Sequence, residues 1–474
     1  MTSITKVFKQ FPRTFWIANT IELFERWAWY GFFMLFANYL TGSSDVGGLG
    51  FTQTQKGLIM GVGTGILYFL PVLTGSIADK YGYKRVLLIA FVIYTSAFIL
   101  LPMFNTFIGV FAMYLYLAVG AALFKPIISA TIAKTTNSTT SSIGFGVFYM
   151  MVNIGAFFGP MVTLLFKNDY HFVFYISAGI IALNFILLIF YTEPGRVKLN
   201  ETLWSTIKQV FKNIWLVLHD FKFVIFLLIV AGFWTMYYQL FFTLPVFISQ
   251  WVDTASLYNF FSNYIPFVAK VYGDNGQMES EFIVNSDAFF IILFQILISA
   301  LVMKKKPLNT MLAGFIIASI GMAFTLMTQN VIYTIIAMLI FGIGEMTASP
   351  KITEYIGRIA PVDSKALYMG YSFLPVFLGS IFAGFISGGV YQDMSDKHEL
   401  LVKEVSLRGI DINDGLSLNN YFSEAASRMD MTQQELTNYL WDAYHPEDIW
   451  FVILGIGLFS AFCLWMYNRF LIKT

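Results

Sequence analysis

The sequence contains few charged residues and only one cysteine. Charged side chains make up 12% of its 474 residues, against 57% hydrophobic residues, and the mean hydropathy is +0.67. Soluble domains carry about 25% charged residues, so this composition predicts an integral membrane protein. The lone Cys463 excludes an internal disulfide framework and a thiolate metal cluster. A net charge of +1 argues against a nucleic-acid partner.

Motifs for enzymatic chemistry are also missing. The sequence has no HExxH helix, no nucleophile elbow and no G-x-x-x-x-G-K-[ST] loop for ATP. Its four histidines fall at the edges of hydrophobic segments or in loops: His171, His219, His398 and His445. We therefore expect neither an enzyme nor a cofactor or metal site. Residues 1–13 lack the apolar core of a cleavable signal peptide, so we expect the first hydrophobic span to be retained.

Long hydrophobic segments are what the sequence does contain. A helix that crosses a bilayer needs about 20 mostly apolar residues. Twelve segments meet this requirement: residues 14–40, 55–78, 85–103, 106–131, 143–166, 172–192, 222–249, 287–303, 308–327, 331–357, 366–390 and 449–470. The sequence thus predicts an all-α membrane protein with twelve transmembrane helices, and an even number of spans places both chain ends on one side.

Lysine and arginine predict the direction of these spans. With the N-terminus in the cytoplasm, the inward segments hold most of the basic residues: Lys6, Lys9, Arg13, Lys80, Lys84, Arg85, Lys134, Arg196, Lys198, Lys208, Lys212, Lys222, Lys304, Lys305, Lys306, Arg358, Lys365, Arg469 and Lys473. The short outward turns offer little beyond Lys56 and Lys167. The positive-inside rule therefore predicts a multi-pass protein of the cell (inner) membrane with both termini cytoplasmic.

The spans divide into two halves of six. We expect an N-terminal bundle over residues 1–192, a cytoplasmic linker over 193–221, and a C-terminal bundle over 222–474. The linker has apolar and basic residues at helical spacing, which predicts a helix lying along the inner membrane surface. A function for the linker beyond joining the halves is the alternative.

Two outer loops, 250–286 and 391–448, are too long for tight turns. In the second loop, Thr432 and Glu435 form a capping box ahead of an apolar helical face, which predicts a short helix. The loop then serves as a solvated cap without a ligand of its own. The alternative is a binding role, as in a surface sensor or adhesin.

Charged residues occur inside the predicted spans: Glu22, Glu25, Arg26, Lys125 and Glu345. A charged side chain at the bilayer centre costs about 2.5–3.5 kcal/mol, so such residues usually face an interior cavity and pair there. The first three are spaced i, i+3 and i+4, which places them on one face of the first helix. Their excess negative charge requires a cation, and Lys125 is the candidate.

Lys125 and Glu345 fall on the fourth and tenth spans, which are corresponding helices of the two halves. Each is followed by a proline, Pro126 and Pro350, at a comparable depth. This arrangement predicts a cavity on the pseudo-twofold axis, with a cation on one side and a carboxylate on the other. A zwitterion would fit there, its carboxylate at Lys125 and its ammonium group at Glu345. The alternative is that these charges only lock helices together.

Many aromatic residues lie near these charges in the sequence. Their rings could line side-chain pockets and hold an ammonium group by cation–π contact. The candidates are Trp29, Tyr30, Tyr68, Tyr149, Trp234, Tyr237 and Tyr238. Because 18% of the chain is aromatic, packing is the alternative role for each of them.

Four motifs together resemble those of one family. The segment "ELFERWAWYG" at 22–31 resembles the ExxER(F)xYYG signature of the proton-dependent oligopeptide transporters, a branch of the major facilitator superfamily. The segment "FGVFYMMVNIGAF" at 145–157 is similar to the family's fifth-helix signature, "FKP" around Lys125 to its fourth-helix lysine motif, and "GEMTASP" around Glu345 to its tenth-helix motif. "GSIADKYGYKR" at 75–85 matches only the general superfamily loop.

The resemblance covers nearly all of the helical core and implies a fold and a function. The fold is the major facilitator fold, with two pseudo-symmetric six-helix bundles. The function is proton-coupled symport of di- and tripeptides into the cytoplasm by alternating access, by a monomer in the lipid bilayer. Its implied proton-coupling residues are Glu22, Glu25 and Arg26. Its implied substrate-binding residues are Trp29, Tyr30, Tyr68, Lys125, Asn153, Trp234, Tyr238 and Glu345. Asp79 and Arg85 are implied gate residues at the inner face.

The sequence also departs from the family pattern. Residues 193–221 leave no room for the two extra helices of many bacterial members, and Phe33 stands where arginine is common. The seventh helix reads "FWTMYYQ", with Tyr237 and Tyr238 where the family carries a glutamate. Tyrosine hardly ionises near neutral pH, so it cannot carry the proton. The proton stoichiometry or the substrate is then expected to differ.

Two further possibilities follow from this departure. Asp287 opens the eighth span, close to where the family has an asparagine, and is a candidate compensating acid or a plain interfacial cap. The rival function is a carrier on the same scaffold for another zwitterion or organic anion, with altered or absent proton coupling.

Overall fold

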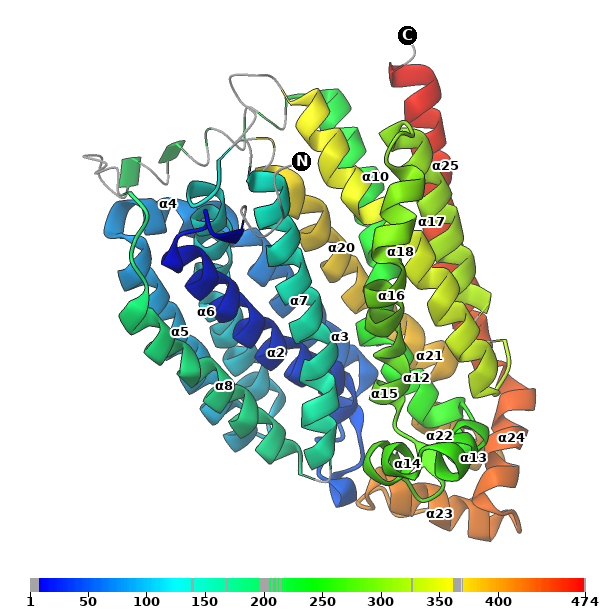
Figure 1. Cartoon of the computed structure of the whole chain (residues 1–474). Helices are drawn as coiled ribbons and strands as arrows, with labels where there is room; N and C mark the ends of the chain where they lie inside the picture. The colour runs from blue at the N-terminus through cyan, green and yellow to red at the C-terminus, as the bar shows by residue number, and fades with distance from the viewer. Residues whose placement is uncertain are drawn as a thin grey trace.

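The computed structural model describes residues 8–137, 140–167, 169–195, 219–324, 327–360 and 370–472, with isolated positions between 204 and 217 and at 368. These residues fold into two helical bundles that lie side by side, with both chain termini at the same end (Figure 1). We call this the terminal end and the opposite one the distal end. The surface helix predicted within 193–221 lies largely outside the described residues.

The N-terminal bundle is built from the helices that precede the linker. They are α2 (Arg13–Thr41), α3 (Gln53–Phe69), α4 (Pro71–Tyr81), α5 (Tyr83–Leu100), α6 (Phe107–Lys134), α7 (Ser141–Thr163) and α8 (Tyr170–Phe190). The pair α3–α4 bends by 43° at Pro71. Proline has no backbone N–H to donate, and its ring clashes with the preceding turn of the helix. The single span predicted over 55–78 is therefore two helices.

The C-terminal bundle contains the second set of long helices. They are α10 (Phe221–Tyr237), α11 (Gln239–Phe242), α12 (Leu244–Trp251), α16 (Ser286–Val302), α17 (Pro307–Phe324), α18 (Val331–Ile359), α20 (Leu374–Phe385), the π-helical turn Ile386–Val390, α21 (Tyr391–Ser395) and α25 (Ile449–Met466). The seventh span is thus interrupted twice, where α10, α11 and α12 meet.

The number of membrane spans is consistent with the twelve predicted. Within the described residues, ten helices are long and apolar enough to cross a membrane, and the bent pair α3–α4 makes an eleventh. Helix α2 runs through the N-terminal bundle as well (Figure 1), although Glu22, Glu25 and Arg26 lower its mean hydropathy. The chain is an integral membrane protein.

The distal end of the C-terminal bundle carries a cap of short elements (Figure 1). They are α13 (Ala255–Tyr264), α14 (Pro266–Tyr272), the strands β1 (Gly273–Asp274) and β2 (Gln277–Met278), α15 (Ser280–Val284), α22 (Lys397–Leu407), α23 (Leu418–Arg428) and α24 (Gln433–Tyr444). The strands pair antiparallel, and Asn275 and Gly276 make the turn with positive φ angles, as an Asn-Gly hairpin requires.

The predicted helix in the 391–448 loop is confirmed as α24. Thr432 is its N-cap and forms the capping box with Glu435, each side chain bonding to the other's backbone N–H. The hydrogen bond from the backbone N–H of Thr432 holds the pKa of Glu435 below its ordinary value. The capping box therefore fixes where α24 begins.

Glycines bring α2 and α7 into backbone contact within the N-terminal bundle. A Cβ atom added at Gly155 would lie 2.7 Å from the Cβ of Arg26, and one added at Gly159 would lie 3.0 Å from the backbone nitrogen of Gly31. Gly155 and Gly159 are four residues apart, the small-xxx-small spacing that lets membrane helices approach closely. The fifth-span motif thus holds α7 directly against the charged face of α2.

A second glycine contact joins the two bundles near the distal end. On α3, a Cβ at Gly61 would lie 2.8 Å from the Cα of Gly384 on α20, and one at Gly57 would lie 2.8 Å from the Cα of Gly388. Both helices therefore present glycines at the same four-residue spacing. The two bundles are therefore in direct backbone-to-backbone contact at these glycines.

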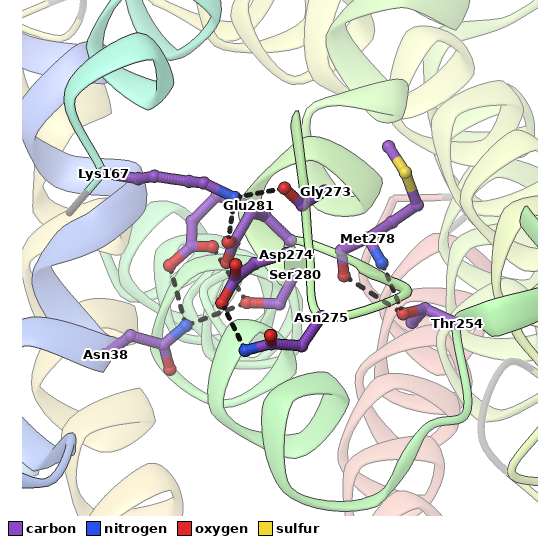
Figure 2. Close-up of polar contacts among 10 residues, drawn as sticks. Asn38, Lys167, Thr254, Gly273, Asp274, Asn275, Met278, Ser280 and Glu281 are labelled. Carbon is purple, nitrogen blue, oxygen red and sulfur yellow. Dashed lines mark hydrogen bonds and ion pairs between the residues drawn. The ribbon is translucent and has the colours of Figure 1, made fainter. Parts of the chain in front are cut away.

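Polar side chains complete this distal contact (Figure 2). Lys167, from the N-terminal bundle, donates to the carbonyl of Gly273 at 2.8 Å and pairs with Glu279 at 2.5 Å. Asn38 on α2 donates to the hydroxyl of Ser280 at 2.8 Å and to the carboxylate of Glu281 at 2.7 Å. The hairpin and α15 therefore tie the C-terminal bundle to the N-terminal one.

Lys56 departs from the expectation that it lies in a short outward turn. It belongs to α3, its side chain is 0% exposed, and its Nζ has no hydrogen-bond partner. The ammonium group lies over the ring of Tyr391, 5.2 Å from the centroid, and is close enough to Asp396 to interact electrostatically. Its burial follows from the docking of the C-terminal bundle onto α3.

Candidate functional site

The charged cluster on α2 is buried inside the N-terminal bundle. The Nη2 of Arg26 donates to Glu25 at 2.6 Å, and its Nε also bonds that carboxylate and lies 3.4 Å from Glu22. The hydroxyl of Tyr94 on α5 donates to Glu25 at 2.8 Å. Bidentate pairing of this kind fixes the orientation of a guanidinium group. Arg26 is therefore held between two acids by its own helix.

Lys125 on α6 supplies the second cation near this cluster. Its Nζ lies 4.8 Å from the ring centroid of Tyr68, and the side chain is close enough to Glu22 to interact electrostatically. The guanidinium of Arg26 lies in the same way over the ring of Tyr30, at 5.8 Å. Two acids and two cations thus balance within the N-terminal bundle, and each cation also contacts an aromatic face.

An aromatic cavity of 240 Å³ lies between the bundles. It is lined from α2, α3, α10, α11, α18, α20 and the turn that precedes α20. The lining residues are Trp29, Tyr30, Phe33, Thr64, Tyr68, Trp234, Tyr237, Tyr238, Phe241, Ser349, Ile352, Thr353, Ser372, Phe373 and Val376. The rings of Tyr68 and Tyr238 meet edge to face across the cavity with their centroids 6.4 Å apart.

Five of the predicted substrate-binding residues line this cavity: Trp29, Tyr30, Tyr68, Trp234 and Tyr238. Lys125 and Glu345 are not lining residues, but each is next to a tyrosine that is. Lys125 stands over Tyr68, and Glu345 is close enough to Tyr237 and Tyr30 to interact with both. The structure thus places a cation against one lining tyrosine, Tyr68, and a carboxylate against another, Tyr237.

Asn153 is the predicted residue that the structure does not bring to the cavity. Its amide nitrogen donates to the backbone carbonyl of Tyr149, one turn earlier on α7, at 2.9 Å. Its role at a substrate therefore stays a prediction. The predicted gate residue Asp79 accepts from the hydroxyl of Tyr83 at 2.9 Å at the terminal end.

Sequence reasoning missed several polar residues of the lining. Thr64, Ser349, Thr353 and Ser372 also line the cavity. The hydroxyl of Thr64 is hydrogen-bonded to that of Tyr114, whereas the hydroxyl of Ser349 is buried without a partner. One signal was available, since Ser349 belongs to the tenth-span motif. The other three sit on apolar segments whose inward face only the packing of the bundles defines.

Comparison with known proteins places the fold in a family. A family model described as Major Facilitator Superfamily matches residues 19–384. The chain belongs to this superfamily. Its members are transporters, so the protein is a transporter and not an enzyme.

Individual relatives of this superfamily member differ in what their names state. The multidrug resistance protein MdtH of Proteus mirabilis (strain HI4320) is 23% identical over 78% of this chain and 85% of its own. The peptide transporter YePEPT of Yersinia enterocolitica is 30% identical over 36% of this chain and 34% of its own. The crystal structure of a POT family transporter in complex with 5-aminolevulinic acid superposes with a TM-score of 0.68 at 19% identity, over 94% of this chain and 95% of that one. The fold is therefore that of the major facilitators.

Proposed function

We propose that this protein is a proton-coupled symporter that carries di- and tripeptides into the cytoplasm. The observation that carries the proposal is the aromatic cavity between the bundles, with Lys125 against the ring of Tyr68 and Glu345 beside Tyr237. A short peptide in its zwitterionic form offers a carboxylate to the first and an ammonium group to the second. The aromatic lining accepts side chains of many shapes. The crystallised POT family transporter and the peptide transporter YePEPT support the same substrate class.

The proposal includes an orientation and a conformation. The terminal end faces the cytoplasm of the cell (inner) membrane, as the distribution of basic residues predicts. The distal contact then closes the outer side, since Lys167, Asn38 and the glycines of α3 hold the bundles together there. This is the inward-facing state of a cycle in which the bundles rock about the central cavity.

The α2 cluster provides the coupling in this scheme. When a proton from outside reaches Glu22 or Glu25, the carboxylate loses its charge and its attraction for Arg26 and Lys125. The released cation is then available to the carboxylate of the peptide. After the bundles rock, the lower proton concentration inside draws the proton away, and the cation returns to its acid. The peptide is left without its partner and dissociates.

Uptake into proteoliposomes tests the proposal. We expect accumulation of dialanine under an inward pH gradient, and none when the gradient is collapsed. Lys125→Ala removes a charge-assisted contact worth about 1.5–3 kcal/mol, so the apparent affinity should fall about tenfold to a hundredfold. Glu345→Gln should also weaken it. Lys270→Ala, an exposed lysine on α14, is the matched control and should leave uptake unchanged.

A carrier for another zwitterion is the second candidate. The related crystal structure contains 5-aminolevulinic acid, and the rings of Tyr237 and Tyr238 leave the α10 side of the cavity without an acid. Competition decides between the two: labelled dialanine is offered against an excess of either dipeptides or 5-aminolevulinic acid. Preferential inhibition by dipeptides supports peptide transport. Uptake of labelled 5-aminolevulinic acid without uptake of dialanine would reject peptide transport.

A further inference from the structure

A buried aspartate lies at the start of α16, outside the α2 cluster. Asp287 is 6% exposed, and its Oδ1 is buried without a hydrogen-bond partner. A Cβ atom added at Gly342 on α18 would lie 3.0 Å from that oxygen, so the carboxylate reaches α18 where the helix has no side chain. Asp287 is therefore not the interfacial residue that one reading of the sequence allowed.

The cap part of that alternative, in which Asp287 caps the first turn of α16, does not fit the geometry either. The N-cap of α16 is Asn285, and its side chain makes no capping hydrogen bond. Asp287 follows two residues later, yet its Oδ1 accepts no backbone N–H. A cap residue places its oxygen on the free N–H groups of the first turn. The carboxylate of Asp287 points instead toward α18.

Glu345 lies one helical turn beyond Gly342 on α18. Its Oε2 is also buried without a hydrogen-bond partner, and the two carboxylates are close enough to interact electrostatically. The other titratable groups that face them are phenols: Tyr149 on α7, Tyr237 on α10 and Tyr30 on α2. Among the described residues, no lysine or arginine pairs with either acid.

This setting decides the charge of the pair. A buried carboxylate without a cation is destabilised by the loss of water, and a second ionised carboxylate beside it adds repulsion. A single proton bound by either acid removes one of the charges and with it the repulsion between the carboxylates. We propose that Asp287 and Glu345 form a second proton-binding site, which holds one proton between them in the inward-facing state and releases it during the transport cycle.

The inference rests on the proposed function for its role in transport, but not for the existence of the shared proton. Arg26 stabilises the ionised acids of α2. The protonation state of the Asp287–Glu345 pair depends instead on the proton concentration and on whether a ligand is bound at Glu345. An ammonium group arriving at Glu345 would favour its ionised form. The proton is then left on Asp287 or released toward the cavity. The pair thus links occupancy of the cavity to a second proton.

The number of coupled protons tests this role. Proteoliposomes are held at zero membrane potential, and the accumulation of dialanine is measured at equilibrium across a fixed pH gradient. If Asp287→Asn removes one coupled proton, accumulation at a gradient of one pH unit should fall tenfold, while exchange at symmetrical pH persists. Asp274→Asn, an exposed aspartate of the β1–β2 hairpin, is the matched control. An unchanged accumulation ratio in Asp287→Asn would overturn the proposal.

Two further measurements keep the test decisive. Gly342→Ala keeps both acids but pushes Asp287 away from α18, so the repulsion between the two carboxylates falls and half-maximal uptake should move to lower pH. An unchanged pH profile counts against the pair.

Infrared spectroscopy needs no transport. The parent should show a protonated carboxyl band near neutral pH, and this band should be altered in Asp287→Asn. If the parent takes up no dialanine, the proposed function fails, and this band alone decides whether the pair shares a proton. An identical spectrum would reject the pair.

Discussion

Two sets of buried or half-buried charges can be compared between the bundles. One is a set of cations on the N-terminal bundle, and the other is a set of acids on the C-terminal bundle. The cations are Arg26, Lys56, Lys125 and Lys167, and the acids are Glu279, Asp287, Glu345 and Asp396. Only the N-terminal bundle also contains acids that neutralise its own central cation, at Glu22 and Glu25.

This difference separates interactions that bundle movement leaves intact from those that depend on the relative position of the bundles. Arg26 and its acids share one helix, so their pairing survives any movement of the bundles. Lys167 and Glu279 lie on different bundles and separate when the distal end opens. Asp287 and Glu345 have no cation among the described residues in the present state. These two acids therefore depend on protons or on substrate for their compensation.

The largest expected effect comes from removing the cation of the N-terminal bundle. Arg26→Ala leaves Glu25 and Glu22 buried without their principal partner, which typically costs about 3–5 kcal/mol. We expect a large fall in the melting temperature of the detergent-solubilised protein and complete loss of pH-driven uptake. Glu345→Gln is the contrasting change, because it removes an acid that has no cation, and its melting temperature should stay near that of the parent. Equal destabilisation by both would contradict the comparison.

An intermediate effect is expected at Lys56, in the opposite direction. Lys56→Met keeps the length of the side chain and removes a buried ammonium group that makes no hydrogen bond, a burden of about 1–3 kcal/mol. The distal-closed state should become more stable, seen as a higher melting temperature together with slower turnover. Lys56→Arg, which retains the charge, should not show this gain. A lower melting temperature for the methionine variant would show that Tyr391 and Asp396 compensate the charge fully.

The smallest effect is expected at the half-buried pair of the distal contact. Lys167→Ala removes one ion pair and one bond to the backbone of Gly273, which together are worth about 0.5–1 kcal/mol at a partly exposed site. Global stability should hardly change, but labelling of a cysteine introduced at the buried Ser280 of the distal contact, in a background without Cys463, should become faster because the distal end opens more often. Lys270→Ala serves again as the matched control. Unaltered labelling would mean that the glycine contact alone holds the distal end closed.

The sequence was sufficient for features that depend on one helix. The spans follow from hydropathy, and the face shared by Glu22, Glu25 and Arg26 follows from helical spacing, so the sequence alone predicts both. The start of α24 followed from the capping box at Thr432. These patterns lie within 30 residues or fewer, and no other element has to be placed to interpret them.

Features that depend on docking could not be predicted in the same way. Lys56 stands near the start of a span and is therefore predicted in an outward turn, but its burial requires Tyr391 and Asp396 from the other bundle. Asp287 was open to two interpretations, since its depth is set by the contact with Gly342 on α18. Lys167 and Glu279 are separated by 112 residues, and no local pattern connects them.

The glycine contact between α3 and α20 has a consequence for inhibition. The contact is formed by Gly57, Gly61, Gly384 and Gly388, which contribute no side chains. Opening of the distal end would therefore expose the peptide backbone of both helices, and the contact could form again without a change of side-chain rotamer at these positions. In the proposed orientation, a compound that reaches the distal end from outside the cell and fills this space with a flat aliphatic or aromatic group would hold the helices apart. It would trap the carrier facing outward without occupying the central cavity, and a high concentration of substrate would not displace it.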